Sequence, residues 1–301
     1  MKIFLRLLQL GMMVMLVNSA VCFAKKPTAK HPDQLTVKSV NGPVEAREMK
    51  QEKISYKDFA IALYKPTYIL PYYYTGSPDT AAYQGTTPNN ERLKNAEIKY
   101  QISLKVPVWK NMFGSSTSLY FAYTQLSYWQ LYAPKAFMRE NDYEPEVFFA
   151  NHVDWHLFNK WNLNFLNVGA EHQSNGFGNS LERSWNRLYL DAIASNDNWM
   201  VDIKPWYILS KNANNTNIAN YLGYVKVIVA YKYHQQVFTI QGYNLIEHGG
   251  KRPSAEVTWS FPLTKYIKGY LQAFSGYGQS LIEYNHHTNS AGIGLSFNDW
   301  I

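Results

Sequence analysis

Three side chains that could carry out acyl-transfer chemistry lie in one short stretch, GAEHQSNGFGNSLERSWNRLYL (169–190). His172 and Ser174 are two residues apart, and Asn186 follows a glycine-rich turn. A serine hydroxyl becomes a nucleophile when an imidazole takes its proton, and a third group must hold that imidazole in the right tautomer. Asn186 could be this third group, because an amide orients the ring without supplying a negative charge.

The alternation around these residues predicts the face of the strand on which they lie. Residues i and i+2 of a strand point to the same side. Apolar residues at every second position from 166 to 170 lead into His172 and Ser174, and Asn186 begins a similar apolar row in the next segment. An incidental H-x-S pair is the competing interpretation. If the rows face lipid, the substrate must lie in the membrane, and a phospholipid ester is the natural choice.

The elements that would position these residues have the pattern of membrane strands. The run AEIKYQISLKVPV (96–108) is apolar at every second position. Strands of soluble sheets have about 5–6 residues, whereas a tilted membrane-barrel strand has about 10 and alternates apolar outside with polar inside. No segment shows sustained helical spacing. The sequence therefore predicts an all-β chain, a transmembrane antiparallel β-barrel of about twelve strands, with a soluble all-β domain as the alternative.

The connections between these strands alternate in length, as bacterial outer-membrane barrels require, with the long loops outside the cell. Short turns are expected at 109–115, 157–161, 194–198, 233–236 and 262–266, and longer polar loops at 131–143, 175–184, 208–217, 246–254 and 283–290. The expected location is the bacterial outer membrane, with the candidate site near the outer leaflet.

The N-terminal residues predict three segments. Residues 1–24 have two basic residues, a short apolar run and a small-residue cleavage site, which indicates a signal peptide. Residues 25–55 are expected to be a poorly ordered lead-in, and 56–301 the barrel. The only cysteine, Cys22, lies in the signal peptide, so no disulfide is expected. The net charge of +7 suits anionic lipid headgroups, and no nucleic-acid partner is expected.

A resemblance extends these expectations. The motifs HQSNG (172–176) and RSWNRLY (183–189), with YTQLSYWQL (123–131), RENDYEPEVF (139–148) and NWMVDIKPWY (198–207), resemble the bacterial outer-membrane phospholipase A family. The resemblance covers about residues 57–301. It implies a twelve-stranded barrel that needs Ca²⁺, is activated by homodimerisation, and cleaves the sn-1 and sn-2 ester bonds of phospholipids and lysophospholipids.

The resemblance also implies roles for residues of this chain. Ser174 corresponds to the nucleophile, His172 to the base and Asn186 to the third member of the triad. Gly176 would donate its main-chain N–H to the oxyanion. Gln125, on an otherwise apolar row, would form a hydrogen bond across the dimer interface; an amide that reaches a neighbouring backbone group is the alternative.

The implied calcium site departs from the family pattern in two places. Phe177 matches a main-chain ligand, and a second main-chain ligand, near Lys135, would come from the partner subunit. Glu182 stands where the family has a serine ligand, and Asn214 where the family has an acidic loop residue. Carboxylate oxygens are good ligands for Ca²⁺, so Glu182 is expected to keep the site. The alternative function is a passive porin or adhesin barrel with an inactive triad.

Overall fold

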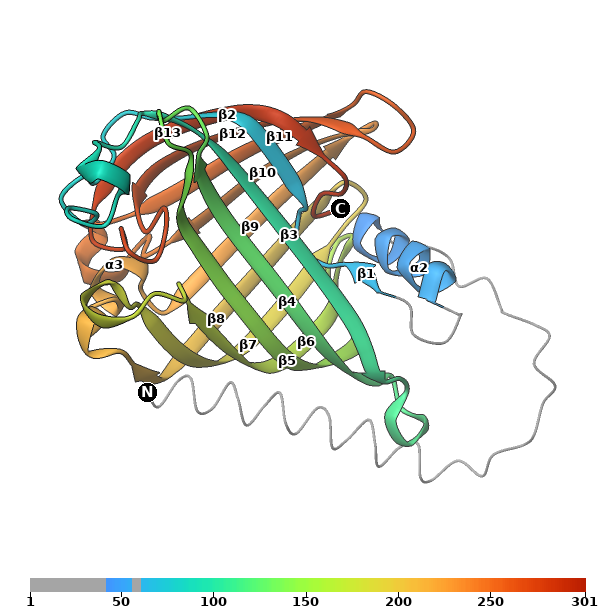
Figure 1. Cartoon of the computed structure of the whole chain (residues 1–301). Helices are drawn as coiled ribbons and strands as arrows, with labels where there is room; N and C mark the ends of the chain where they lie inside the picture. The colour runs from blue at the N-terminus through green and yellow to red at the C-terminus, as the bar shows by residue number, and fades with distance from the viewer. Residues whose placement is uncertain (1–41, 56–60) are drawn as a thin grey trace.

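The computed structural model describes residues 42–55 and 61–301, and these form one antiparallel β-barrel with a helix at one end (Figure 1). The strands are β1 (Ala62–Leu63), β2 (Tyr68–Thr75), β3 (Ala96–Trp109), β4 (Thr117–Gln130), β5 (Phe137–Phe158), β6 (Trp161–Ser174), β7 (Ser184–Ser195), β8 (Trp199–Lys211), β9 (Val225–Tyr233), β10 (Gln236–Tyr243), β11 (Ser254–Pro262), β12 (Lys268–Tyr277) and β13 (His287–Ser296). The α-helices are α2 (Pro43–Ser55) and α3 (Ala219–Leu222), and short 3-10 turns are η1 (Pro88–Asn90), η2 (Met112–Gly114), η3 (Asn179–Leu181), η4 (Ala213–Asn215) and η5 (Glu247–Gly250).

The barrel is closed by twelve strands. Each strand from β2 to β13 pairs with the next along the chain, and β13 pairs back onto β2. The two-residue β1 adds to β3 beyond the start of β2. Closure removes free sheet edges, so the backbone hydrogen bonds of the wall can be made within the wall. The twelve-stranded barrel predicted from the alternation is confirmed. In the part of the chain that is described, no helix is long and apolar enough to cross a membrane.

Most connections alternate in length, but three predicted loops differ from the structure: β8 extends to Lys211 inside the predicted loop 208–217, β13 begins at His287 inside 283–290, and the loop after β4 is short. The short turns all lie at one end of the barrel and the longer loops at the other. The predicted polar loop 131–143 is wrong at its C-terminal half, because β5 already begins at Phe137. Its charged residues belong to the strand: Arg139 and Glu140 are buried, and Arg139 pairs with Glu97 and Glu283 at 2.8 Å each. Polarity here indicates the barrel interior and not a loop.

The outer wall carries the apolar half of the alternation. Large apolar side chains are exposed on strands around the whole barrel, including Ile102, Phe121, Val147, Ile240 and Ile293. Polar neighbours of these residues in sequence, such as Gln101 and Gln241, line the interior cavity. A band of this kind is what lipid-facing strands require.

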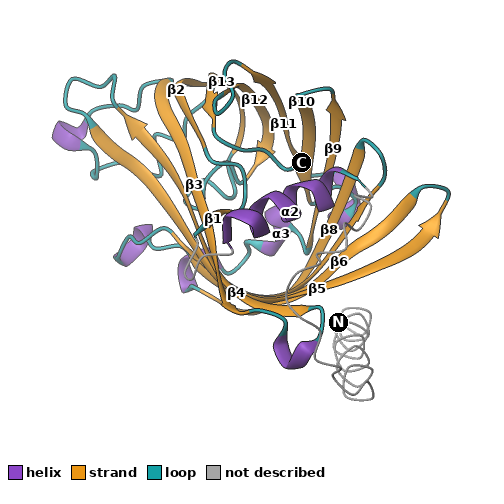
Figure 2. Ribbon diagram, turned by 90° about the vertical axis from the view of Figure 1, so that its right-hand side faces the viewer, coloured by secondary structure: helices purple, strands orange, loops and turns teal. Residues whose placement is uncertain are grey.

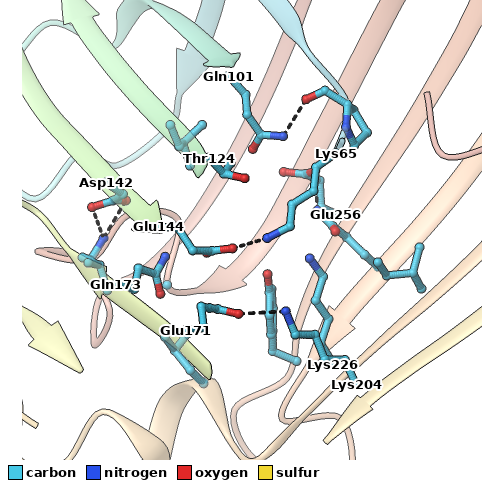
Figure 3. Close-up of a pocket in the computed structure, with 18 of the residues that line it drawn as sticks. Lys65, Gln101, Thr124, Asp142, Glu144, Glu171, Gln173, Lys204, Lys226 and Glu256 are labelled. Carbon is cyan, nitrogen blue, oxygen red and sulfur yellow. Dashed lines mark hydrogen bonds and ion pairs between the residues drawn. The ribbon is translucent and has the colours of Figure 1, made fainter. Parts of the chain in front are cut away.

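Charged side chains fill the interior (Figure 3). Lys65 lies 2.9 Å from Glu146, Lys204 lies 2.7 Å from Glu171, and the Arg187 guanidinium pairs with the same Glu171. These groups come from β5, β6, β7, β8 and the segment before β2. The cavity that they leave measures about 170 Å³. The ion pairs therefore connect the inner faces of the strands that carry the candidate site.

Helix α2 lies at the short-turn end of the barrel (Figure 2). Val44 is buried in an apolar cluster with residues of β8, β9 and the C-terminus. Glu48 pairs with Lys105 of β3 at 3.1 Å, and the Arg47 guanidinium donates to the main-chain oxygen of Trp300 at 2.7 Å. These contacts with several strands hold the helix in the mouth of the barrel.

This helix corrects one expectation about the N-terminal region. The lead-in 25–55 was expected to be poorly ordered, but its last residues, 43–55, form α2. Local composition misses the helix because its order comes from the contacts with the barrel. The expected signal peptide, 1–24, and the rest of the lead-in up to residue 41 lie outside the described residues.

Replacement of Glu171 tests the importance of the interior ion pairs. Glu171→Gln removes the carboxylate that Arg187 and Lys204 share, and loss of one partner of a buried pair costs on the order of 3 kcal/mol. We expect a lower temperature for the shift between the folded and unfolded bands on gels. Lys160→Ala, which breaks the exposed pair with Asp197, should leave that temperature unchanged. Equal behaviour of the two variants would contradict the role of Glu171.

Candidate functional site

The candidate residues lie side by side on the outer face of β6 and β7. In the antiparallel pairing of these strands, His172 is directly opposite Asn186, and Ser174 is opposite Ser184. The residues that alternate with them, such as Glu171, line the interior cavity. Because strand neighbours point to opposite sides, His172, Ser174 and Asn186 project outwards. The face predicted from the alternation is the face observed.

His172 and Asn186 form a hydrogen bond across the two strands. The His172 Nδ1 lies 2.8 Å from the Asn186 Oδ1, and both side chains are half-buried. An amide oxygen can only accept, so the proton of the neutral imidazole is on Nδ1 and Nε2 is left as an acceptor. This is the tautomer that a base needs in order to take a proton from a hydroxyl.

Ser174 is the next residue along the same row. Two residues on one strand face have Cα atoms about 7 Å apart, a gap that an imidazole ring can span. The hydrogen bonds among residues 42–55 and 61–301 include none between the Ser174 hydroxyl and the His172 ring. Such contacts often tighten only when substrate is bound.

The loop between β6 and β7, residues 175–183, is ordered by a buried amide. Asn175 is 2% exposed. Its Oδ1 accepts from the Arg183 N–H at 2.9 Å, and its Nδ2 donates to the Leu181 carbonyl at 2.9 Å. The main-chain N–H of Asn175 donates to the Arg183 carbonyl. The loop is therefore closed directly beside the nucleophile candidate.

The backbone conformation at position 176 requires a glycine. Its φ is +67°, in the left-handed region, and a Cβ there would lie 2.7 Å from the Tyr143 ring. Tyr143 of β5 is paired with Ser174. Among the described residues, no group accepts a hydrogen bond from the Gly176 N–H, so this donor is available close to the hydroxyl of Ser174.

The candidate calcium ligands come from two loops that touch. Phe177 and Glu182 are in the loop after β6, and Asn214 is in the loop after β8. The Asn214 Nδ2 donates to the main-chain oxygens of Asn179 at 2.7 Å and Glu182 at 3.3 Å. Asn214 thus joins the two loops that carry the candidate ligands, which include a carboxylate and main-chain carbonyls, the oxygen donors that Ca²⁺ prefers.

Lys135 lies in a different loop from these candidate ligands. It belongs to the connection between β4 and β5, where its Nζ contacts the Asn89 side chain at 3.4 Å.

A second group of carboxylates lies inside the barrel. Glu144, Glu146 and Glu171 have oxygen atoms within 4.8 Å of one another. These carboxylates pair with Lys65 and Lys204. Because the cations already balance them and the barrel wall separates them from the outward-facing residues, they are not the predicted calcium site.

Gln125 is also on the outer wall, on β4. Its Oε1 accepts from the Tyr123 hydroxyl at 3.0 Å, and its Nε2 donates to Ser127 Oγ at 3.0 Å. Ser127 donates in turn to Asn141 Oδ1 at 2.7 Å. The amide is therefore bonded within its own chain, but to side chains and not to the neighbouring backbone group that the sequence offers as the alternative, and it belongs to a polar row on the wall.

One contact at the site was not foreseen from the sequence. The Asn186 Nδ2 donates to the Ser210 Oγ at 2.7 Å. Simple alternation along β8 puts Trp206 and Ile208 on the inner face and would put Ser210 there too. A change of register between β7 and β8 turns Ser210 outwards, and the sequence carries no signal for it.

Comparisons with known proteins agree on one family. The family model described as Phospholipase A1 matches residues 44–297. Phospholipase A1 of Klebsiella pneumoniae is 40% identical over 213 residues, which cover 69% of this chain and 73% of that protein. Phospholipase A1 of Escherichia coli K12 is 34% identical over 287 residues, which cover 91% and 94%.

Solved structures give the same result. Outer membrane phospholipase A from Escherichia coli superposes with a TM-score of 0.76 at 34% identity, covering 81% of this chain and all of that one. The Salmonella typhi outer membrane phospholipase, a dimer with bound calcium, has a TM-score of 0.79 at 34% identity, covering 87% and 99%. This chain is a β-barrel of the bacterial outer membrane and belongs to the phospholipase A1 family.

Proposed function

We propose that this barrel hydrolyses the acyl esters of membrane phospholipids, with Ser174 as nucleophile, His172 as base and Asn186 as the group that orients the imidazole. The observation that carries the proposal is the 2.8 Å hydrogen bond between His172 Nδ1 and Asn186 Oδ1 on the outer wall. A site on this face meets lipid directly. Membership of the phospholipase A1 family supports the same substrate class.

The proposed reaction has two halves. The Ser174 Oγ attacks the ester carbonyl carbon while His172 Nε2 takes the hydroxyl proton. The ester C–O bond breaks, and the lysophospholipid alcohol leaves with the proton from His172. Water then attacks the acyl-enzyme by the same route, which releases a fatty acid and restores Ser174. The Gly176 N–H donates to the oxyanion in each half.

The proposed substrates include sn-1 and sn-2 esters and lysophospholipids. An outward-facing hydroxyl beside a flat strand surface selects weakly between two neighbouring ester bonds of one lipid, because either can approach it from the bilayer. Phospholipids labelled separately at the two positions would give the ratio of released fatty acids.

Calcium is proposed as the cofactor, held by the Glu182 carboxylate and the Phe177 main-chain oxygen, with Asn214 beside them and a main-chain oxygen near Lys135 of a second copy. The donors fit a hard cation. Bound there, Ca²⁺ would supply positive charge that stabilises the developing oxyanion. The Salmonella typhi relative contains calcium in its dimer.

Dimerisation is proposed as the activating step. One chain contributes the outward-facing triad but not the calcium ligand near Lys135, and the polar row that contains Gln125 lies two strands from β6. A second barrel against this wall would complete the site. An enzyme that is inactive as a monomer would also spare the bilayer that contains it.

The alternative function, a passive pore, has little support. The interior is crossed by buried ion pairs of Lys65 with Glu146 and of Lys204 with Glu171. A diffusion channel needs a continuous aqueous path.

The triad is tested by three single substitutions. Ser174→Ala and His172→Ala should reduce acyl release from phosphatidylethanolamine by about 10³-fold or more, and Asn186→Ala by less, since orientation contributes less than the nucleophile or base. All three variants should keep the heat-dependent gel shift of a folded barrel. Full activity in Ser174→Ala would end the proposal, and equal losses in all three would contradict the ranking.

The calcium site is tested by titrating activity with Ca²⁺. Glu182→Ala should raise the Ca²⁺ concentration for half-maximal activity on the order of tenfold, because one charged ligand is lost. Glu91→Ala, a loop carboxylate in the connection between β2 and β3, serves as the control. An unchanged midpoint in Glu182→Ala would remove Glu182 from the site.

The dimer is tested at Gln125. Gln125→Leu should lower the cross-linked dimer fraction and the activity in parallel, because the amide is removed from the proposed interface. Ile240→Ala changes an exposed residue of β10, six strands away around the ring of twelve, and should change neither. A normal dimer fraction in Gln125→Leu would exclude this face as the interface.

A further inference from the structure

The orienting amide of the proposed triad has a partner at each end. Asn186 Oδ1 accepts from His172, and Asn186 Nδ2 donates to the Ser210 hydroxyl at 2.7 Å. Ser210 is exposed near the end of β8. Among the described residues, Asn186 is the only hydrogen-bond partner of the Ser210 side chain.

A β-bulge creates this contact. Arg187 of β7 is paired with Ile208, and both belong to the inner face. The residue before Arg187, Asn186, is paired with Ser210 and not with Leu209. Leu209 is the extra residue on β8. Without the bulge, Asn186 would be opposite Leu209, and the side chain of Ser210 would lie on the inner face with that of Ile208. Bulges redirect side chains next to active sites and are common there.

An amide anchored at one end can move. The terminal torsion of an asparagine side chain is broad and poorly restrained, so one hydrogen bond to a mobile imidazole does not define the amide plane. If the amide turned over, its N–H would face His172 Nδ1 and move the ring proton to Nε2, and the ring could then accept no proton from Ser174. A second hydrogen bond, to a side chain on a different strand, restrains the plane of the amide. Because the Ser210 hydroxyl can accept or donate, it limits the movement of the amide without selecting which end faces His172.

We propose that Ser210 is a positioning residue that holds the plane of the Asn186 amide against His172 and so keeps the imidazole oriented for catalysis. The inference rests on the proposed function of the triad and extends it to a third strand. Ser210 acts only through Asn186, since it makes no contact of its own with His172 or Ser174. The row of outward side chains then runs from Ser174 through His172 and Asn186 to Ser210, across β6, β7 and β8.

The test uses the full-length protein in detergent micelles with Ca²⁺ and a short-chain phosphatidylcholine. Ser210→Ala should lower kcat about five- to tenfold, the equivalent of one hydrogen bond, with KM within about twofold of the parent value because the substrate is not touched. Ser210→Thr keeps the hydroxyl and should restore most of kcat. A purely structural effect would not follow the hydroxyl in this way.

A matched control is present on the other side of the barrel. The Ser275 hydroxyl of β12 donates to Asn289 Oδ1 of β13 at 2.7 Å, a serine–asparagine pair across neighbouring strands. Ser275→Ala should leave kcat unchanged. In an Asn186→Ala background, Ser210→Ala should cause no further loss, since its effect is transmitted through the amide.

The outcomes separate this inference from the proposed function. If the parent protein releases no fatty acid, or if Ser174→Ala retains activity, the proposed function fails. If both behave as proposed but Ser210→Ala equals Ser275→Ala, or lowers kcat equally in the Asn186→Ala background, the role of Ser210 is overturned. A Ser210→Thr variant as slow as Ser210→Ala would overturn it as well.

Discussion

The pairing register of β6 with β7 is the constraint on which the site depends. It places His172 opposite Asn186 on the outer face and, one residue away, Glu171 opposite Arg187 on the inner face. Because side chains alternate with a period of two, a slip of one residue would turn the imidazole into the barrel and a buried ion pair into the lipid. The same register therefore determines both the chemistry outside and the charge balance inside.

The inner face of the barrel wall holds the strands together, and the outer face carries the candidate site. Inside, the carboxylates of β5 and β6 are neutralised by Lys65, Lys204 and Arg187, which hold neighbouring strands together. Outside, His172, Asn186 and Ser210 form a row of hydrogen bonds between strands whose positions are already determined. A site on paired strands has less freedom than one on loops. Only Gly176 and the proposed calcium ligands are in loops, and Asn175 closes the loop that contains Gly176.

Strict alternation made much of this predictable from sequence. It indicated twelve strands, the outward face of His172 and Ser174, and their apolar row. Three features were not predictable, each for a physical reason. The start of β5 was mistaken for a loop because its charges face the interior, α2 is ordered by contacts with the barrel, and Ser210 reaches Asn186 only because a bulge breaks the alternation.

The most direct measurement of this register is a nitroxide scan of residues 167–174 in lipid vesicles, with collision rates for lipid-soluble O₂ and a water-soluble nickel chelate. The account predicts high O₂ collision rates at positions 168, 170, 172 and 174 and low rates at the positions between them. A maximum at 171 and 173, or no alternation along the strand, would contradict an outward-facing site.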